Sequence, residues 1–189
     1  MSEKNCYLVV DLEATCDDAG AVPREQMEII EIGAVLVAGD SLDPIADWQS
    51  FVRPQRHPEL TSFCTELTSI TQAQVDASPP FPEVLDAFCS WWGALVRSGH
   101  GAPIFCSWGD YDRKQFKQDC MHHGLKYPLP ARHINVKGEF SKALGSSRKF
   151  GMAGALKKVG LPLVGTHHRG IDDARNIAKL LPWALGRKA

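Results

Sequence analysis

Two acidic residues stand two positions apart at the end of an apolar segment near the N-terminus. Asp11 and Glu13 directly follow the run Tyr7-Leu8-Val9-Val10. Because alternate side chains of a strand point to the same face, this spacing places both carboxylates on one face and close together. Two like charges at that separation repel each other, and a divalent cation between them relieves the repulsion. The segment therefore predicts a metal site at the end of a central strand.

A second group of ionisable residues lies far downstream, at the start of a predicted helix. After Gly170 the apolar residues recur with a helical period, at positions 171, 174, 177, 178 and 181. Asp172 and Asp173 fall in the first turn of this helix, where the helix dipole favours negative charge. His168 comes five residues before Asp173 and upstream of the helix. It can therefore share a cleft with Asp173 without lying on the same helical face.

Several further segments match the motifs of a known class of nuclease. They are Asp11-Leu12-Glu13-Ala14-Thr15-Cys16, residues 28–33, residues 51–54, 60–64 and 67–71, residues 107–116, and the segment from His168 to Asp173. In these segments the sequence resembles the 3′-to-5′ exonucleases of the DEDDh class (the DnaQ-like superfamily), and most of all their Eri-type exoribonuclease branch. The resemblance extends from about Tyr7 to Leu181. Each motif alone is a weak signal, whereas four in order with compatible spacing are a strong one.

The resemblance implies an activity and a set of metal ligands. It implies hydrolysis of single-stranded RNA, or also DNA, from the 3′ end, with release of nucleoside 5′-monophosphates and two divalent cations per active site. Asp11 would bridge both ions, Glu13 and Asp173 would hold the ion on the nucleophile side, and Asp112 would hold the other. His168 would take the proton of the attacking water, as its ordinary pKa lies near working pH. Oxygen-only ligands suit Mg²⁺ or Mn²⁺.

The second motif contains two aspartates, and only one matches the family position. Asp112 matches it, and Phe116 follows four residues later on the same helical face. Asp110 is predicted to cap the N-terminus of this helix.

The third motif offers two histidine–aspartate pairs with the same spacing. His168 is five residues before Asp173, and His167 is five residues before Asp172. Ala174 after Asp173 resembles the family pattern and favours the pair of His168 and Asp173. In the alternative register, His167 and Asp172 would take the roles of His168 and Asp173.

The resemblance also implies contacts with the terminal nucleotide. Phe63 would contact the last nucleotide and Tyr111 would lie near it, because a terminal base needs a stacking partner. Core packing is an equally good interpretation of both rings. A backbone carbonyl within Leu12, Ala14 or Thr15 could accept a hydrogen bond from the 2′-hydroxyl that distinguishes RNA from DNA.

Length and composition indicate one domain. The 189 residues suffice for a substantial core, and we expect a single catalytic domain over 1–189 with its core at about 6–185. The net charge of −1 excludes an overall basic field, although a local groove can still be basic. The six cysteines form no C-x-x-C pair and indicate free thiols in a reducing compartment. The chain shows no apolar run of membrane-spanning length, so we expect a cytoplasmic protein that does not associate with membranes.

The pattern of apolar residues and turn signals predicts a mixed α/β fold. An antiparallel meander of three strands is followed by alternating helices and strands, which fits the ribonuclease H-like fold that the resemblance implies. Pro182 is expected to end or kink the last helix. The strands are predicted at 6–12, 28–38, 47–53, 104–107 and 133–136, and the helices at 81–96, 111–123, 138–144, 151–159 and from 171, with a short capped helix after Thr71.

Two other function classes compete with an exonuclease. A haloacid-dehalogenase-type phosphatase begins with Asp-x-Asp-x-Thr after an apolar strand, but Glu13 is one methylene too long for the second aspartate, and that class has no use for His168 with Asp173. A catalytically silent nucleic-acid-binding module on the same fold is the other. It is disfavoured because all five catalytic positions are filled.

Overall fold

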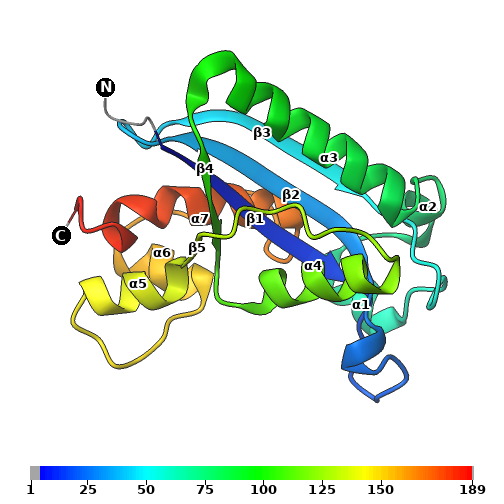
Figure 1. Cartoon of the computed structure of the whole chain (residues 1–189). Coiled ribbons are helices and arrows are strands. Elements are labelled where there is room, and N and C mark those ends of the chain that lie inside the picture. The colour runs from blue at the N-terminus through cyan, green and yellow to red at the C-terminus, as the bar shows by residue number, and fades with distance from the viewer. Residues whose placement is uncertain (1–4, 189) are drawn as a thin grey trace.

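A five-stranded mixed sheet forms the centre of the molecule in this computed structural model, which describes residues 5–188 (Figure 1). The strand order is β3-β2-β1-β4-β5. β1 pairs antiparallel with β2 and β2 with β3, whereas β1 with β4 and β4 with β5 are parallel. The predicted meander and mixed sheet are thus confirmed. The strands are β1 Cys6–Ala14, β2 Ile29–Ala38, β3 Pro44–Phe51, β4 Pro103–Ser107 and β5 His133–Asn135.

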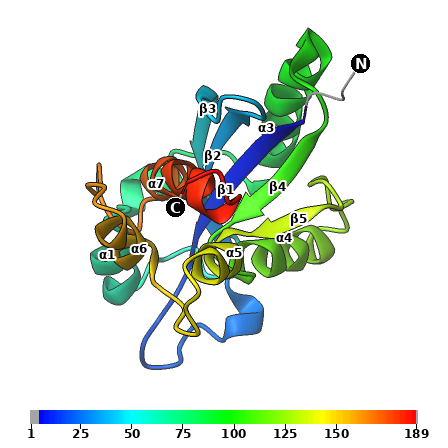
Figure 2. The ribbon, with the colours of Figure 1, turned by 90° about the vertical axis from the view of Figure 1, so that its left-hand side faces the viewer.

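Helices cover both faces of the sheet (Figure 2). The helices α3 and α4 lie on one face, and α5, α6 and α7 pack against the other. No helix in the described part of the chain is long and apolar enough to cross a membrane. The helices are α1 Ser62–Thr68, α2 Gln72–Asp76, α3 Phe81–Leu95, α4 Tyr111–His122, α5 Val136–Ala143, α6 Met152–Lys158 and α7 Gly170–Ala184, with a short 3₁₀ turn at Arg24–Gln26.

The side chains of β1 alternate between the two helical layers. Leu8 and Val10 belong to the core under α3 and α4, whereas Tyr7 and Val9 belong to the core under α5, α6 and α7. Burial of each such side chain stabilises the fold by roughly 1.5–3 kcal/mol. Asp11 and Glu13 continue the odd-numbered series at the end of this strand. The alternation that buries the strand therefore also directs both carboxylates toward the layer that contains α7.

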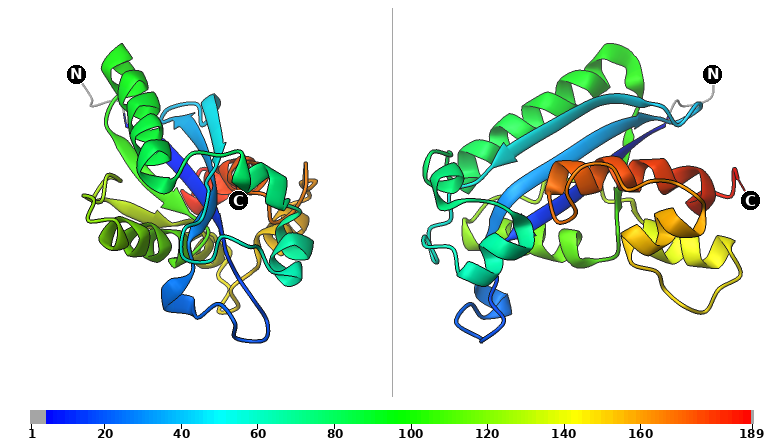
Figure 3. Two further views of the ribbon diagram at one scale, coloured as in Figure 1. Left: turned by 90° about the vertical axis from the view of Figure 1, so that its right-hand side faces the viewer. Right: turned by 180° about the vertical axis from the view of Figure 1, so that it is seen from behind.

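The first turn of α7 lies against the sheet (Figure 3, right), and a glycine on each side makes the contact, Gly170 of α7 and Gly33 of β2. A Cβ atom on Gly33 of β2 would lie 2.0 Å from the carbonyl carbon of Gly170, and a Cβ on Gly170 would lie 3.0 Å from the Asp11 carbonyl oxygen. Glycine at position 33 is required for this approach, and a Cβ at position 170 would make a tight contact with the backbone of β1 and β2. The contact brings Asp173, in that first turn, to the end of β1.

Two elements differ from the sequence-based expectation. β3 occupies Pro44–Phe51 rather than 47–53, and its proline is the first residue of an edge strand, where a missing amide costs no ladder hydrogen bond. α1 was not predicted. Its N-cap is Thr61, whose hydroxyl accepts a hydrogen bond from the Cys64 amide at 3.0 Å.

Pro182 lies inside α7 instead of ending it at once. The helix continues to Ala184, and the Leu185 amide still reaches the Leu181 carbonyl at 2.9 Å. The proline therefore stands within the last turn, where the loss of one helical amide disturbs little of the remaining helix.

Candidate active site

A cleft of about 320 Å³ opens at the end of β1, between the N-termini of α4, α6 and α7. All five residues predicted to act in catalysis line it, together with Leu12 and Tyr111. Three further residues that were not predicted from the sequence line it, namely Trp108, Gly151 and Met152. Trp108 stands inside the matched segment 107–116, which was the available signal for it, whereas nothing in the sequence pointed to the other two.

Three carboxylates converge in this cleft. Single oxygen atoms of Asp11, Glu13 and Asp173 lie within 4.8 Å of one another. Burial, followed by the charge of Asp112 and the other acids, raises the pKa of Asp11 well above its ordinary value. Burial and the charge of Asp173 raise the pKa of Glu13 to about 9. The raised pKa values show that the three carboxylates repel one another when they are ionised. A divalent cation fits such a cluster of oxygen donors, because its charge would offset that repulsion.

Asp112 completes the acidic set from a different element, the first turn of α4. Its Oδ1 accepts a hydrogen bond from the Leu12 amide at 3.1 Å. Burial raises the pKa of Asp112 to about 6, and the bond from Leu12 opposes that shift. The ladder between β1 and β4 ends at Val9 and Cys106, so the side chain of Asp112 supplies the acceptor that a longer β4 would have supplied.

Asp110 stands at the N-cap position of α4, as predicted, but its side chain makes no capping hydrogen bond. The carboxylate forms an ion pair with Arg113 at 3.0 Å and accepts a hydrogen bond from the Asn135 amide group at 3.3 Å. These two partners hold it away from the amides of the first turn. The predicted N-cap position of Asp110 is thus correct, whereas the predicted capping hydrogen bond is not formed.

The two aspartates at the start of α7 point to different environments. Asp173 joins the acidic cluster, whereas Asp172 forms an ion pair with Arg175 at 3.5 Å and accepts a hydrogen bond from the Thr166 amide at 2.9 Å. The structure therefore brings Asp173, and not Asp172, to Asp11 and Glu13.

Both histidines of the third motif lie against Asp173. The Nδ1 of His167 is 2.9 Å from Oδ2 of Asp173, and the backbone amide of His168 donates to the same oxygen at 3.0 Å. The two imidazole rings stack with their centroids 4.0 Å apart. Burial and the neighbouring His167 lower the pKa of His168. Both rings line the cleft, so the choice of His168 as the base stays a prediction.

Glu31 is a buried acid beside the cleft that the sequence analysis did not single out. It is 0% exposed and lies opposite Glu13 in the β1–β2 ladder. Its carboxylate accepts hydrogen bonds from the Gly170 amide at 3.0 Å and from Nε of Arg169 at 3.1 Å. It therefore ties the N-terminus of α7 to β2. A glutamate within an otherwise apolar strand was the signal that could have found it.

The residues that were predicted to contact a nucleotide lie in three different environments. Leu12 and Tyr111 line the cleft. Ala14 and Thr15 are buried behind it, and the Thr15 hydroxyl is engaged by the Glu28 amide at 2.9 Å. Phe63 is half-buried on α1 and lies outside the cleft lining. Which of them contact a nucleotide stays a prediction.

The fold is of the ribonuclease H-like type, and acids from β1, α4 and α7 meet at one cleft. A family model described as Exonuclease (RNase_T) matches residues 8–181. The chain belongs to this exonuclease family.

Proteins of known sequence or structure agree with this assignment. ERI1 exoribonuclease 3 of Homo sapiens is 36% identical over 181 residues, which are 93% of this chain and 52% of that protein. The nuclease domain of 3′hExo, a DEDDh family member bound to rAMP, shares 32% identity with a TM-score of 0.87 over 95% of this chain and 91% of its own. A 3′-exonuclease solved for recognition of the histone mRNA stem-loop 3′ end has a TM-score of 0.89 at 29% identity, over 97% of this chain and 64% of its own. The chain spans about half the length of ERI1 exoribonuclease 3 and of 3′-5′ exoribonuclease 1, and 28% of the length of human ERI1 exoribonuclease 2.

Proposed function

We propose that this chain is a 3′-to-5′ exoribonuclease that releases nucleoside 5′-monophosphates from a free 3′ end. The observation that carries the proposal is the convergence of Asp11, Glu13 and Asp173 within 4.8 Å, with Asp112 on the same cleft. The relatives named as exoribonucleases and the nuclease domain bound to rAMP favour RNA as the substrate.

Members of the DEDDh family depend on divalent metal ions. The four acids here offer only oxygen donors, which fit Mg²⁺ or Mn²⁺, and we assign them two ions. Such ions supply electrostatic stabilisation of the charge that develops on the phosphoryl group during transfer. Asp11, central among the four acids, would contact both ions. Glu13 and Asp173 would hold one and Asp112 the other.

His168 is assigned as the general base that takes a proton from the attacking water. Burial lowers the pKa of this imidazole, so that a neutral ring with a free nitrogen predominates near neutral pH. The bond from its backbone amide to Asp173 fixes the loop from which the ring projects into the cleft. A positioned base of this kind contributes roughly 10²- to 10⁴-fold in rate.

The substrate end is assigned to the side of the cleft formed by Leu12 and Tyr111. The Tyr111 ring offers a flat surface for a terminal base, and the backbone carbonyl of Leu12 offers an acceptor for a 2′-hydroxyl. Six free thiols fit a reducing compartment, and we assign the protein to the cytoplasm on that ground.

The two competing classes predict different products. A phosphatase would use Asp11 as a nucleophile, yet burial and the surrounding acids raise the pKa of this carboxylate and make it a poor nucleophile without cations. A silent binding module would bind an oligonucleotide and leave it intact.

One experiment separates the three classes. RNA and DNA of matched sequence, labelled at the 5′ or 3′ end, are incubated with Mg²⁺, Mn²⁺ or chelator, beside p-nitrophenyl phosphate and a circular RNA. We expect a ladder that shortens from the 3′ end with either cation, and none with chelator. Asp11→Asn is the inactive control. Cleavage of the circle, activity that survives chelation, or release of p-nitrophenol alone would contradict the proposal.

A further inference from the structure

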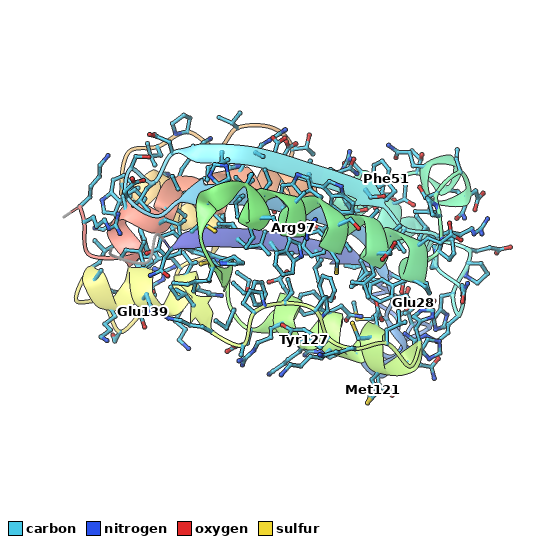
Figure 4. The ribbon with its side chains drawn as sticks, turned by 45° about the horizontal axis from the view of Figure 1, so that its top comes forward. Glu28, Phe51, Arg97, Met121, Tyr127 and Glu139 are labelled. Carbon is cyan, nitrogen blue, oxygen red and sulfur yellow. The ribbon has the colours of Figure 1, made fainter. Side chains whose placement is uncertain are left out.

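The outward side of α4 carries only basic charge. The helix buries Asp112, Gln115, Phe116, Asp119 and Cys120, so both of its acids face the core. The positions on the opposite side are Arg113, Lys114, Lys117 and Met121. Met121 is 79% exposed and projects away from the molecule, which marks this side in Figure 4. The chain as a whole has a net charge of −1, so the basic face is a local feature.

This basic side begins at the active-site cleft. Tyr111 lines the cleft, and Lys114 follows it three residues later on the same side of the helix. Arg24 of the β1–β2 connection lies against the same helix farther along, since its carbonyl accepts a hydrogen bond from the Gln118 side chain at 3.2 Å. Its charge also acts on Tyr111, where it opposes the burial that raises the pKa of the phenol. Two separate segments thus supply cations along this side of α4.

The positive charge extends along the helix to its other flank. Nζ of Lys117 lies 5.3 Å from the centre of the Tyr127 ring, which Figure 4 shows beside α4. Lys126 and Arg132 are exposed in the segment that follows the helix. Within the described residues, ion pairing on the outward side of α4 involves Arg113, which pairs with Asp110, whereas Lys114 and Lys117 form no ion pair. Their charges therefore remain available to a ligand.

We propose that Arg24, Lys114 and Lys117, the α4 basic face, bind the phosphates of the substrate strand upstream of its 3′-terminal nucleotide. The inference rests on the proposed function, in which the 3′ end occupies the cleft beside Tyr111. A helix of 12 residues is about 18 Å long, which is enough for several consecutive phosphates. Contacts of this kind are independent of sequence and weaken with salt. The α4 basic face would give the enzyme a preference for strands longer than a dinucleotide.

The test compares long and short substrates in two matched double variants. Lys114→Gln with Lys117→Gln removes two charges from the basic face and retains good helix formers. Lys157→Gln with Lys158→Gln removes the same charge from the last turn of α6 and serves as the control. For a single-stranded RNA of ten nucleotides we expect the α4 variant to raise KM about tenfold at low salt, with kcat unchanged. The slope of log KM against log salt should fall by about 1.4.

The dinucleotide is the internal reference. It reaches the cleft but not the rest of the helix, so the α4 variant should cleave it like wild type, and the α6 variant should match wild type on both substrates. An unchanged KM for the long strand, an equal loss on both substrates, or an equal effect of the α6 variant would overturn the inference.

A measurement of RNA binding without hydrolysis distinguishes a failure of this inference from a failure of the proposed function. Fluorescence anisotropy of the ten-nucleotide RNA is measured in chelator for wild type and both variants. Weaker binding by the α4 variant alone supports the basic face even if no hydrolysis is found. Equal binding by all three proteins, or none by wild type, overturns it.

Discussion

The carboxylate of Asp112 and the amide of Leu12 are joined by a hydrogen bond of 3.1 Å. A second acid on the same face of α4 repeats this relationship, because Asp119 Oδ2 accepts a hydrogen bond from the Ile29 amide at 2.7 Å. Both amides lie where the sheet is interrupted. The Leu12 amide lies beyond the end of the β1–β4 ladder, and the Ile29 amide lies at the irregularity in the β1–β2 ladder. Two carboxylates therefore dock α4 onto the sheet, and one of them also faces the cleft.

Asp112→Asn should separate these two roles of the side chain. The amide oxygen of asparagine can still accept the bond from Leu12, so we expect the free energy of unfolding to change by less than about 1 kcal/mol. The negative charge is lost, and we expect the exonuclease rate to fall by about 100-fold or more. Urea unfolding and a labelled-RNA assay measure the two effects. A stable variant with wild-type activity would remove Asp112 from the acidic set.

Metal ions should stabilise the folded protein through the acidic cluster. Ions that bind only the folded state raise its stability by mass action. We expect Mn²⁺ to raise the melting temperature of the wild type and to raise that of Asp11→Asn by less. In chelator the variant should be at least as stable as the wild type, because it lacks one of the mutually repelling charges. Equal metal shifts for the two proteins would show that Asp11 is not a ligand.

Without metal, stability should decrease as the pH rises. The pKa of Glu13 is raised to about 9 in the folded state, so the folded state holds a proton that the unfolded chain releases at lower pH. This contribution is complete below the unfolded pKa and is lost as the pH rises through the folded one. We expect a loss of up to about 1.4 kcal/mol per pH unit for the group. Urea unfolding in chelator between pH 6 and pH 9 measures the slope, and Glu13→Gln should flatten it. The same slope in both proteins would contradict the assignment.

The two histidines of the third motif can be compared directly. His168→Ala should keep the metal-dependent rise in melting temperature yet lose roughly 10²- to 10⁴-fold in rate. His167→Ala removes the ring that contacts Asp173 at 2.9 Å and should lose much less, because that ring is assigned no proton transfer. Single-turnover rates on labelled RNA measure both. An inactive His167→Ala beside an active His168→Ala would transfer the role of base to His167.

The contact between Gly33 and Gly170 should tolerate no added side chain. In Gly33→Ala the new Cβ would meet the backbone of Gly170 at 2.0 Å, so the first turn of α7 must move away from β2. We expect destabilisation of about 3 kcal/mol or more and a smaller stabilisation by Mn²⁺, because Asp173 leaves the cluster. Gly154→Ala in α6, where nothing lies within 4 Å, should instead be neutral or stabilising by up to about 1 kcal/mol. Similar melting temperatures for both variants would refute this explanation.

The sequence alone determined the family, the mixed sheet and the direction of the β1 acids. Local regularities carry this information: the apolar run before Asp11 predicts a buried strand, its period of two places Glu13 on the same face, and the helical period after Gly170 predicts α7. The family and the fold are confirmed. The roles of the individual site residues stay predictions.

Only the tertiary structure decided which neighbouring residues share the cleft. Asp172 and Asp173 are adjacent in the sequence, and the close packing of Gly170 on Gly33 directs Asp173 to Asp11 while Asp172 pairs with Arg175. The partners of Asp112, Asp119 and Glu31 were likewise invisible in the sequence. Each of these acids binds a backbone amide of a distant segment, and every residue except proline offers the same amide, so no local pattern identifies the partner.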